Sequence, residues 1–174
     1  MTRLVNDLLE LSRLDNKEVK WNKRPLKIDL LVGEVVSKMM MSAKKKGLSV
    51  RCEIEENLEV FADRDKMEQV FQNVLSNAIK YTSEGGRIFV KGEKAGNQVC
   101  VSVEDTGIGI PKEDLPRIFE RFYRVDKTRS RELGGTGLGL SIAREIVLAH
   151  DGDIEVQSEP GKGTVVIIKL PALV

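Results

Sequence analysis

The sequence predicts an α+β fold, a two-layer sandwich in which helices cover one face of a mixed, mostly antiparallel sheet. Segments with helical periodicity alternate with pairs of strand-like segments rather than with single strands, which favours antiparallel pairing over a parallel sheet. Two of these pairs are joined by turns at Lys94–Asn97 and Pro160–Gly163 that are typical of hairpins. The 174 residues suffice for one domain with a buried core and an appendage.

The composition argues against several classes of protein. The chain has 28 lysines and arginines against 27 aspartates and glutamates, so no overall field attracts nucleic acid or an anionic membrane. No apolar run approaches the ~20 residues of a membrane span, and the first residues lack a signal-peptide pattern. Cys52 and Cys100 lie singly in strand-like runs, so we expect two buried free thiols and a reducing compartment.

The first helix is expected at residues 2–14, where Leu4, Leu8 and Leu11 recur at helical spacing. No cap or turn introduces it, which suggests the end of a longer helix. Its apolar stripe needs a partner, and another helix is the natural one, although the helix can instead pack on its own domain. The polar residues 16–27 are interpreted as a linker.

The next elements are a helix at 28–46, stopped by Gly47, and two strands at 48–54 and 58–62 around a polar turn. The lysines just before Gly47 suit the carboxyl end of a helix.

Asp63 is expected to cap a long helix at 64–80. The predicted core stripe of this helix is Met67, Val70, Phe71, Val74, Leu75 and Ala78. On an adjacent face, Asn73, Asn77 and Lys80 recur at i, i+4 and i+7. A polar row beside an apolar stripe can line a pocket.

Two hairpins are expected in the second half of the chain, at 87–92 with 97–104 and at 152–158 with 163–170, with a helix at 137–150 between them. The segment 111–135 has little periodicity.

A short helix carrying Phe119 and Phe122 is expected within 111–124. The irregular stretch that follows is charged. The cationic side chains in and next to it are Arg124, Lys127, Arg129 and Arg131.

Two glycine-rich turns carry the strongest functional signal. Asp105–Pro111 reads DTGIGIP after a strand, and Gly134–Leu140 reads GGTGLGL at the start of a helix. Neither is a P-loop, because no Gly-Lys-Ser/Thr follows, and neither is a dinucleotide fingerprint, because no βαβ unit surrounds it. Asp105–Gly107 also matches the start of an aspartic-protease site. That chemistry needs a second matching carboxylate and an all-β fold, and the sequence shows neither.

Taken together, the turns favour a nucleotide site. The carboxylate of Asp105 can accept a hydrogen bond from the exocyclic amine of adenine, and the neighbouring glycines let the backbone approach the flat base. Residues 135–139 expose backbone amides at a helix amino terminus, which suits phosphates. Lys80 and the arginines of 111–135 can offset phosphate charge.

The order of these motifs resembles the catalytic region of two-component sensor histidine kinases, over about residues 30–170. The resembling segments are Asn73–Thr82 (N box), Asp105–Gly109 (first glycine box), Phe119–Arg124 (F box), Gly135–Leu140 (second glycine box) and Gly161–Thr164 (a third). Residues 2–14 resemble the end of the second helix of the family's dimerisation and phosphoacceptor bundle. The nearest resemblance is to the membrane-bound cell-wall and phosphate-sensing kinases of Gram-positive bacteria.

The resemblance implies that 1–15 end a bundle helix, that 16–27 form a linker, and that 28–174 form an ATP-binding domain of the Bergerat type. Within that domain, about 111–135 would be the lid over the nucleotide.

The implied cofactors are ATP and Mg²⁺, with Asn77 as the metal ligand. The implied catalytic residues are Asn73, Lys80 and Arg124. The implied nucleotide contacts are Asn73, Asn77, Lys80, Tyr81, Asp105, Gly107, Gly109, Ile110, Tyr123, Arg124, Gly135, Thr136, Gly137, Leu138, Gly139, Leu140 and Thr164.

Two residues refine the expected reaction. In related ATPases of the gyrase, Hsp90 and MutL type, a glutamate that activates water stands four residues before the metal-binding asparagine. Asn73 occupies this position, and an amide cannot take a proton at neutral pH, which favours transfer to a protein over hydrolysis. His150, the only histidine, is interpreted as a helix-terminal residue favourably placed against the helix dipole. The phosphoacceptor is therefore expected outside this chain.

The implied function is transfer of the γ-phosphoryl group of ATP to a bundle histidine and onward to a response-regulator receiver domain. The resemblance also implies ADP release, a homodimeric parent anchored in the membrane with this part in the cytoplasm, and no nucleic-acid partner. Two alternatives stay open, an anti-sigma-factor type serine kinase of the same superfamily and a non-catalytic ATP-sensing module.

Overall fold

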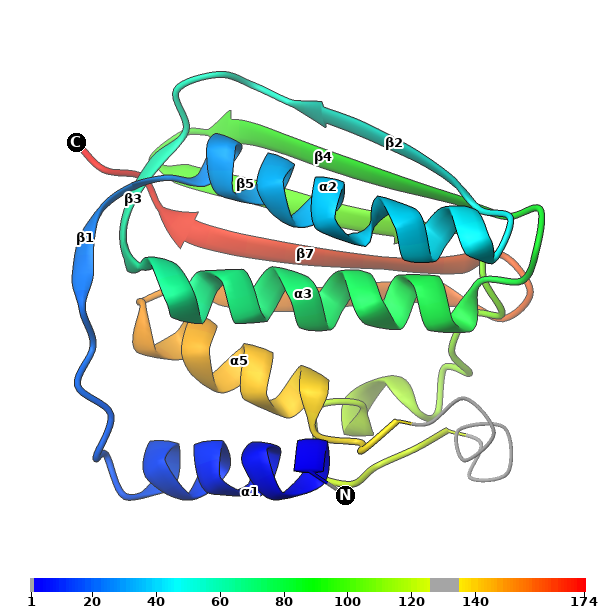
Figure 1. Ribbon diagram of the computed structural model, residues 1–174, viewed down its shortest axis with the longest axis horizontal. Helices are drawn as coiled ribbons and strands as arrows, with labels where there is room; N and C mark the ends of the chain where they lie inside the picture. The colour runs from blue at the N-terminus through cyan, green and yellow to red at the C-terminus, as the bar shows by residue number, and fades with distance from the viewer. Residues whose placement is uncertain (1, 126–134) are drawn as a thin grey trace.

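A computed structural model describes residues 2–125 and 135–174 of the chain (Figure 1). In chain order the elements are α1 (Thr2–Asp15), β1 (Lys23–Lys27), α2 (Ile28–Lys45), β2 (Ser49–Ile54), β3 (Glu59–Asp63), α3 (Arg64–Tyr81), β4 (Arg87–Ala95), β5 (Gln98–Asp105), the short 3₁₀ helix η1 (Leu115–Arg117), α5 (Gly139–Ala149), β6 (Asp153–Glu159) and β7 (Gly163–Pro171).

The main sheet has five strands in the order β2-β4-β5-β7-β6. Its β2–β4 pair is parallel, and the pairs β4–β5, β5–β7 and β6–β7 are antiparallel. Helices α2, α3 and α5 lie along one face of this sheet, and α1 lies beyond α5 (Figure 1). The predicted α+β sandwich with a mixed, mostly antiparallel sheet is therefore confirmed.

Helix α3 is the central helix of the layer, because it packs against both α2 and α5. The carboxylate of Asp63 accepts a hydrogen bond from the backbone N–H of Lys66 at 3.3 Å and caps the helix as predicted. All members of the predicted core stripe are buried in the helix: Met67, Val70, Phe71, Val74, Leu75 and Ala78. Burial of this stripe fixes the rotation of α3 on the sheet.

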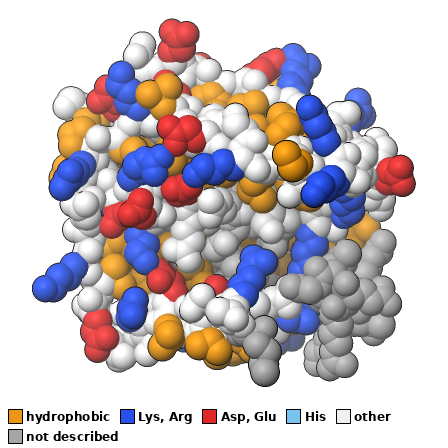
Figure 2. Space-filling view, in the orientation of Figure 1, with side chains coloured by type: hydrophobic (Ala, Val, Ile, Leu, Met, Phe, Trp, Pro, Cys, Tyr) orange, Lys and Arg blue, Asp and Glu red, His pale blue; other side chains and the backbone are white. Residues whose placement is uncertain are grey.

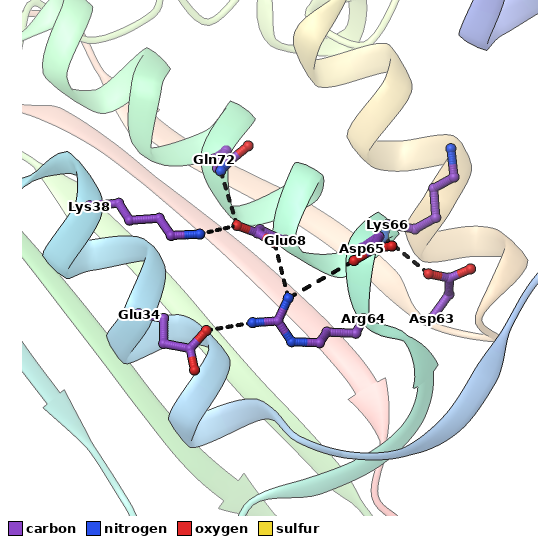
Figure 3. A network of polar contacts seen from close by, with 8 residues as sticks. All are labelled: Glu34, Lys38, Asp63, Arg64, Asp65, Lys66, Glu68 and Gln72. Carbon is purple, nitrogen blue, oxygen red and sulfur yellow. Dashed lines mark hydrogen bonds and ion pairs between the residues drawn. The ribbon is translucent and has the colours of Figure 1, made fainter.

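The outer faces of α2 and α3 are joined by a polar network centred on Glu68 (Figure 3). Its carboxylate accepts hydrogen bonds from Lys38 at 2.6 Å, Arg64 at 3.2 Å and Gln72 at 3.4 Å. Arg64 also pairs with Glu34 of α2. The hydrogen bond from Lys38 is the largest of the effects that lower the pKa of Glu68, so the network holds the two helices most firmly while this carboxyl is ionised.

The predicted linker contains a strand that the sequence did not suggest. Residues 23–27 form β1, which pairs antiparallel with β3 in a separate two-stranded sheet. The strand is short and polar, and Pro25 fits it only because β1 is an edge strand. The two strands expected around the turn before Asp63 therefore separate, since β2 joins the main sheet and β3 pairs with β1.

Two other local expectations were wrong. The short helix expected within 111–124 is reduced to the 3₁₀ turn η1, and Phe119 and Phe122 lie outside it. Phe122 has a φ of 64°, which ends any helical course there. Cys52 is exposed rather than buried, because β2 is an edge strand, and Cys100 is half-buried; both are free.

Helix α1 is only partly covered. Leu11 is buried and Leu14 partly buried against the core. Leu4, Val5, Leu8 and Leu9 are exposed, although Leu4 and Leu8 follow the same helical spacing as Leu11. Apolar side chains are visible at the lower edge of Figure 2, on the side where α1 lies in Figure 1. Among residues 2–125 and 135–174, no helix combines the length and apolarity that crossing a bilayer requires.

His150 lies at the carboxyl end of α5, as the sequence suggested, and is a buried structural residue. Its Nε2 accepts the backbone N–H of Asp63 at 3.1 Å, and its Nδ1 lies 2.7 Å from the carbonyl of Ile146. A carbonyl can only accept, so Nδ1 carries the proton and the ring is neutral. Trp21 packs edge-on against the ring with a centroid distance of 5.1 Å. The linker is thereby fastened to the end of α5.

The free energy of unfolding should depend on the ionisation of His150. Burial is the main cause that lowers its pKa, and Lys23 acts in the same direction, against smaller opposing effects of Ile146, Asp63 and Asp151. The unfolded chain therefore binds a proton first, so this contribution is complete above pH 6.5 and is lost as the pH falls below it. Urea unfolding between pH 7.5 and 5.5 should show decreasing stability.

His150→Gln is the matched variant, because an amide can keep one donor and one acceptor. It should be less stable at pH 7.5 but show a flatter pH dependence. An equal slope in both proteins would contradict the role given to this ring.

Candidate functional site

A cavity of about 450 Å³ opens between α3, the start of α5 and the strands β5 and β7. Its size is in the range of small-ligand sites. The predicted site residues that line it are Asn73, Asn77, Lys80, Tyr81, Asp105, Gly109, Ile110, Tyr123, Arg124, Gly135, Thr136, Gly137, Gly139, Leu140 and Thr164. Residues from both glycine turns thus meet in one place, although about 30 positions separate the turns in the sequence.

Asp105 lies at one end of the cavity, at the end of β5. Its side chain is buried and accepts a hydrogen bond from the backbone N–H of Gly107 at 2.9 Å. Burial raises the pKa of Asp105, while backbone hydrogen bonds from Gly107 and Thr164 act in the opposite direction. A desolvated carboxylate with spare acceptor capacity suits an amine donor on a flat apolar ligand.

Apolar side chains surround this end of the cavity. They are Val103, Ile108, Ile110, Ile118, Val156 and Val166. They offer the kind of walls between which a planar ring can lie.

The first glycine turn is held tightly from outside the cavity. Gly109 has a φ of 72°, and a Cβ there would overlap the carbonyl of Glu159. The backbone N–H of Ile110 donates to Ser158 Oγ at 2.8 Å. The N–H of Gly161 donates to the carbonyl of Ile108 at 2.8 Å, which ties the third glycine segment to the first. The floor of the site is therefore rigid.

The second glycine turn forms the other end of the cavity, where α5 begins at Gly139. Lys80 lies against Gly135, since a Cβ on that glycine would collide with the ammonium group. The guanidinium of Arg124 donates to the carbonyl of Gly135. Two cations next to the amino terminus of a helix form a site for an anion.

The asparagine row of α3 joins the two ends. The amide nitrogen of Asn73 donates to the carbonyl of Gly139 at 3.1 Å and so ties α3 to the start of α5. Asn77 is half-buried and lines the cavity one turn later. Within the described residues no hydrogen bond engages its amide, whose oxygen is a suitable ligand for a hard cation.

Two predicted contact residues do not line the cavity. Leu138 is fully buried in the core, and Gly107 is a packing position, because a Cβ there would lie 2.5 Å from the carbonyl of Tyr81. The predicted lid lies only partly inside the described residues. Its members Lys127, Arg129 and Arg131 fall outside them.

The cavity also has lining residues that the motifs did not suggest, chiefly Arg3 of α1 and Lys46 after α2. Lys46 donates to the carbonyls of Ile79 and Lys80, each at 2.7 Å, and so caps the end of α3. In the sequence, the lysine run before Gly47 indicates only the end of its own helix. Nothing in the sequence places Arg3 here, because its position depends on how α1 packs.

Comparison with known families gives a match over residues 62–174 to the model described as histidine kinase-, DNA gyrase B-, and HSP90-like ATPase. The chain is 44% identical over 173 residues to the sensor histidine kinase WalK of Bacillus subtilis, covering 98% of this chain and 28% of that protein. It is 43% identical to a WalK sensor protein kinase of Staphylococcus aureus, covering 98% of this chain and 41% of that protein. The chain thus spans less than half the length of these relatives. Their Gram-positive source agrees with the resemblance seen in the sequence.

Solved structures agree with the sequence comparison. The catalytic domain of histidine kinase ThkA superposes with a TM-score of 0.76 at 33% identity, covering 86% of this chain and 95% of that one. Full-length ShkA in complex with AMPPNP gives a TM-score of 0.86 at 30% identity, covering 98% of this chain and 35% of that one.

Gly109→Ala should disrupt the floor of the cavity. A left-handed backbone costs a non-glycine residue about 1–2 kcal/mol, and the overlap with the carbonyl of Glu159 adds to this. We expect a loss of at least about 2 kcal/mol in the free energy of unfolding, measured with urea.

Gly33→Ala in α2 is the matched control, because a Cβ there meets nothing within 4 Å and its φ is not positive. It should be neutral or stabilise the protein by about 0.5–1 kcal/mol. Equal effects of the two substitutions would contradict the close packing of the first glycine turn.

Proposed function

Because this chain belongs to the family of histidine kinase-, DNA gyrase B-, and HSP90-like ATPases, we propose that it is the ATP-binding catalytic portion of a sensor histidine kinase. The reaction is transfer of the γ-phosphoryl group of ATP to a histidine on a bundle helix outside this chain. A response-regulator aspartate then receives the group, and ADP is released.

One observation carries the proposal. The cavity has a buried carboxylate and apolar walls at one end and cations beside a helix amino terminus at the other. A nucleoside triphosphate has the same asymmetry, with an amine-bearing flat base and a polyanionic tail. Asp105 then accepts the adenine amine, and residues 135–139 bind the phosphates through backbone amides.

The charged side chains at the phosphate end act on the transferred group. Lys80 and Arg124 offset the negative charge that the phosphates bring into the cavity, and they hold the γ-phosphoryl group for in-line attack. Tyr81 and Tyr123 line the same cavity and help to exclude water.

The donor set also fits Mg²⁺. The amide oxygen of Asn77 would hold the ion, and the phosphates and water would supply the remaining oxygen ligands. The ion, when bound, neutralises phosphate charge. Among the described residues there is no cluster of three or more His, Cys, Asp or Glu side chains that could hold a metal ion by itself, so the nucleotide is needed to complete this site.

Asn73 favours transfer over hydrolysis. Its amide nitrogen already donates to the carbonyl of Gly139, and an amide cannot accept a proton from water at neutral pH. His150 is no acceptor either, because it is buried and both ring nitrogens are engaged. The phosphoryl group therefore has to leave on a histidine that another segment brings to the cavity.

The parent protein is proposed to be a membrane-anchored homodimer with this portion in the cytoplasm. The exposed apolar face of α1 supports a bundle partner, since such a stripe is normally buried. No nucleic-acid partner is proposed, because the net charge is only +1.

Asp105→Asn should weaken nucleotide binding strongly without unfolding the protein. The amide oxygen can still accept from Gly107, but its NH₂ group would then face the adenine amine, donor against donor. We expect at least a 30-fold loss of affinity, about 2 kcal/mol, by calorimetry with the ATP analogue AMPPNP and Mg²⁺.

The free energy of unfolding of Asp105→Asn should not fall, in contrast to its affinity for the nucleotide. Since burial raises the pKa of Asp105, its ionisation costs free energy that builds up as the pH rises through the ordinary aspartate range and remains at pH 7. The neutral amide removes this cost, so the variant should unfold at the same or higher urea concentration. Asp65→Asn, on the exposed side of α3, is the control for affinity and should leave it unchanged, while the loss of a first-turn charge should lower stability by less than about 1 kcal/mol. A folded Asp105→Asn variant with unchanged affinity would refute the assignment of the base end.

Phosphorylation in trans tests the reaction itself. The chain is mixed with the separately prepared histidine-bearing bundle of its parent kinase, Mg²⁺ and γ-labelled ATP. We expect acid-labile label on the bundle and none on the chain alone. Binding without transfer would favour a nucleotide-sensing module, and acid-stable label on an added serine-bearing partner would favour a serine kinase. Absence of nucleotide binding would refute all three.

A further inference from the structure

Part of the cavity wall comes from α1, outside the catalytic motifs. Arg3, in the first turn of the helix, lines the cavity together with Thr136 of the second glycine turn. Asp7, one turn later, accepts a hydrogen bond from Thr136 Oγ1 at 2.9 Å. The start of α1 thus lies beside the start of α5 (Figure 1).

The contact through Thr136 is well defined. Its hydroxyl donates to Asp7 and accepts the backbone N–H of Leu138 at 3.3 Å, so both its donor and one acceptor position are used. Four residues along a helix correspond to about 6 Å. Arg3 is therefore at the phosphate end of the cavity and not at the end that holds Asp105.

Two ion pairs fix the rest of the helix. Glu10 pairs with Lys66 of α3, and the guanidinium of Arg121 donates to Asp15 at 2.7 Å. Leu11, between them, is buried. The orientation of α1 is thus set along its length, and Arg3 is carried to the cavity on a helix that is held in place.

Arg3 itself forms no ion pair or hydrogen bond within residues 2–125 and 135–174. Its i+4 neighbour Asp7 is engaged by Thr136 instead. A guanidinium is always charged, and here it joins a cavity that already contains Lys80 and Arg124. Cations gathered around one cavity repel each other unless a polyanion lies between them.

We propose that Arg3 contacts the terminal phosphate of the bound nucleoside triphosphate, and that Asp7 positions α1 for this contact; the inference rests on the proposed nucleotide-binding function. The bundle helix thereby contributes directly to the site that serves the bundle. A nucleoside diphosphate lacks the group that Arg3 contacts, so α1 also distinguishes the substrate from the product.

Calorimetry of the 174-residue chain with AMPPNP and with ADP, each with Mg²⁺, tests the contact. Arg3→Ala should weaken AMPPNP binding about tenfold and ADP binding less than twofold. Arg13→Ala, on an exposed position of the same helix outside the cavity, is the matched control and should change neither. Equal losses for both nucleotides, or no loss, would overturn the proposal.

Asp7→Ala tests the positioning role through the direction in which the affinity for AMPPNP changes. Removing a carboxylate close to phosphates should strengthen binding if only charge matters. If Asp7 positions the helix, the variant should instead weaken AMPPNP binding in the same nucleotide-selective way as Arg3→Ala. Tighter binding would overturn the positioning role. Failure of the unmodified chain to bind either nucleotide would refute the proposed function, a result distinct from an ineffective Arg3→Ala.

Discussion

The burial of one face of α3 against the sheet determines where the site can lie. The stripe from Met67 to Ala78 is almost fully excluded from water, so the helix has one favourable rotation on β5. At that rotation the row of Asn73, Asn77 and Lys80 lines the cavity. A polar row on this helix cannot move without exposing the stripe, and the site is thus a consequence of core packing. This is why the same helix supplies both the centre of the core and the polar row of the cavity.

The two ends of the cavity have opposite electrostatic character. At the base end a single carboxylate is desolvated, which raises its pKa and makes its ionised form costly until a donor arrives. At the phosphate end, cations and helix amides are gathered where they repel one another until an anion arrives. Each end is unfavourable when empty and favourable when filled. The ligand that relieves both is one molecule with an amine at one end and several negative charges at the other.

The sequence alone predicted those structural features that a local pattern determines. Periodicity placed α3 and its core stripe, the Asp63 cap marked its start, and glycines with special backbone geometry marked both turns of the site. It failed where the outcome depends on distant partners. β1 is too short and polar to be recognised without β3, and the parallel β2–β4 pair joins segments that no turn connects.

The same limit applies within the site. Leu138 is buried in the core, whereas its neighbours in the same turn line the cavity. The glycine motif contains all of these positions and does not distinguish them. The proximity of Arg3 depends on the docking of α1, which no local pattern encodes. Isolated motifs thus indicated most of the residues that line the cavity, whereas its outer wall needed the tertiary structure.

Helix α5 connects the phosphate end of the cavity with the linker. Its first residue accepts the hydrogen bond of Asn73, and its far end carries Leu148 and Ala149 next to His150. His150 is packed against Trp21, and the carbonyl of Ala149 accepts from Lys23. Because a helix of this length is stiff, a force on the linker would be transmitted to the amides that we propose as the phosphate site. Since α1 and the linker are consecutive, a movement of α1 would act on the second glycine turn in two ways, directly through Asp7 and Thr136 and indirectly through α5.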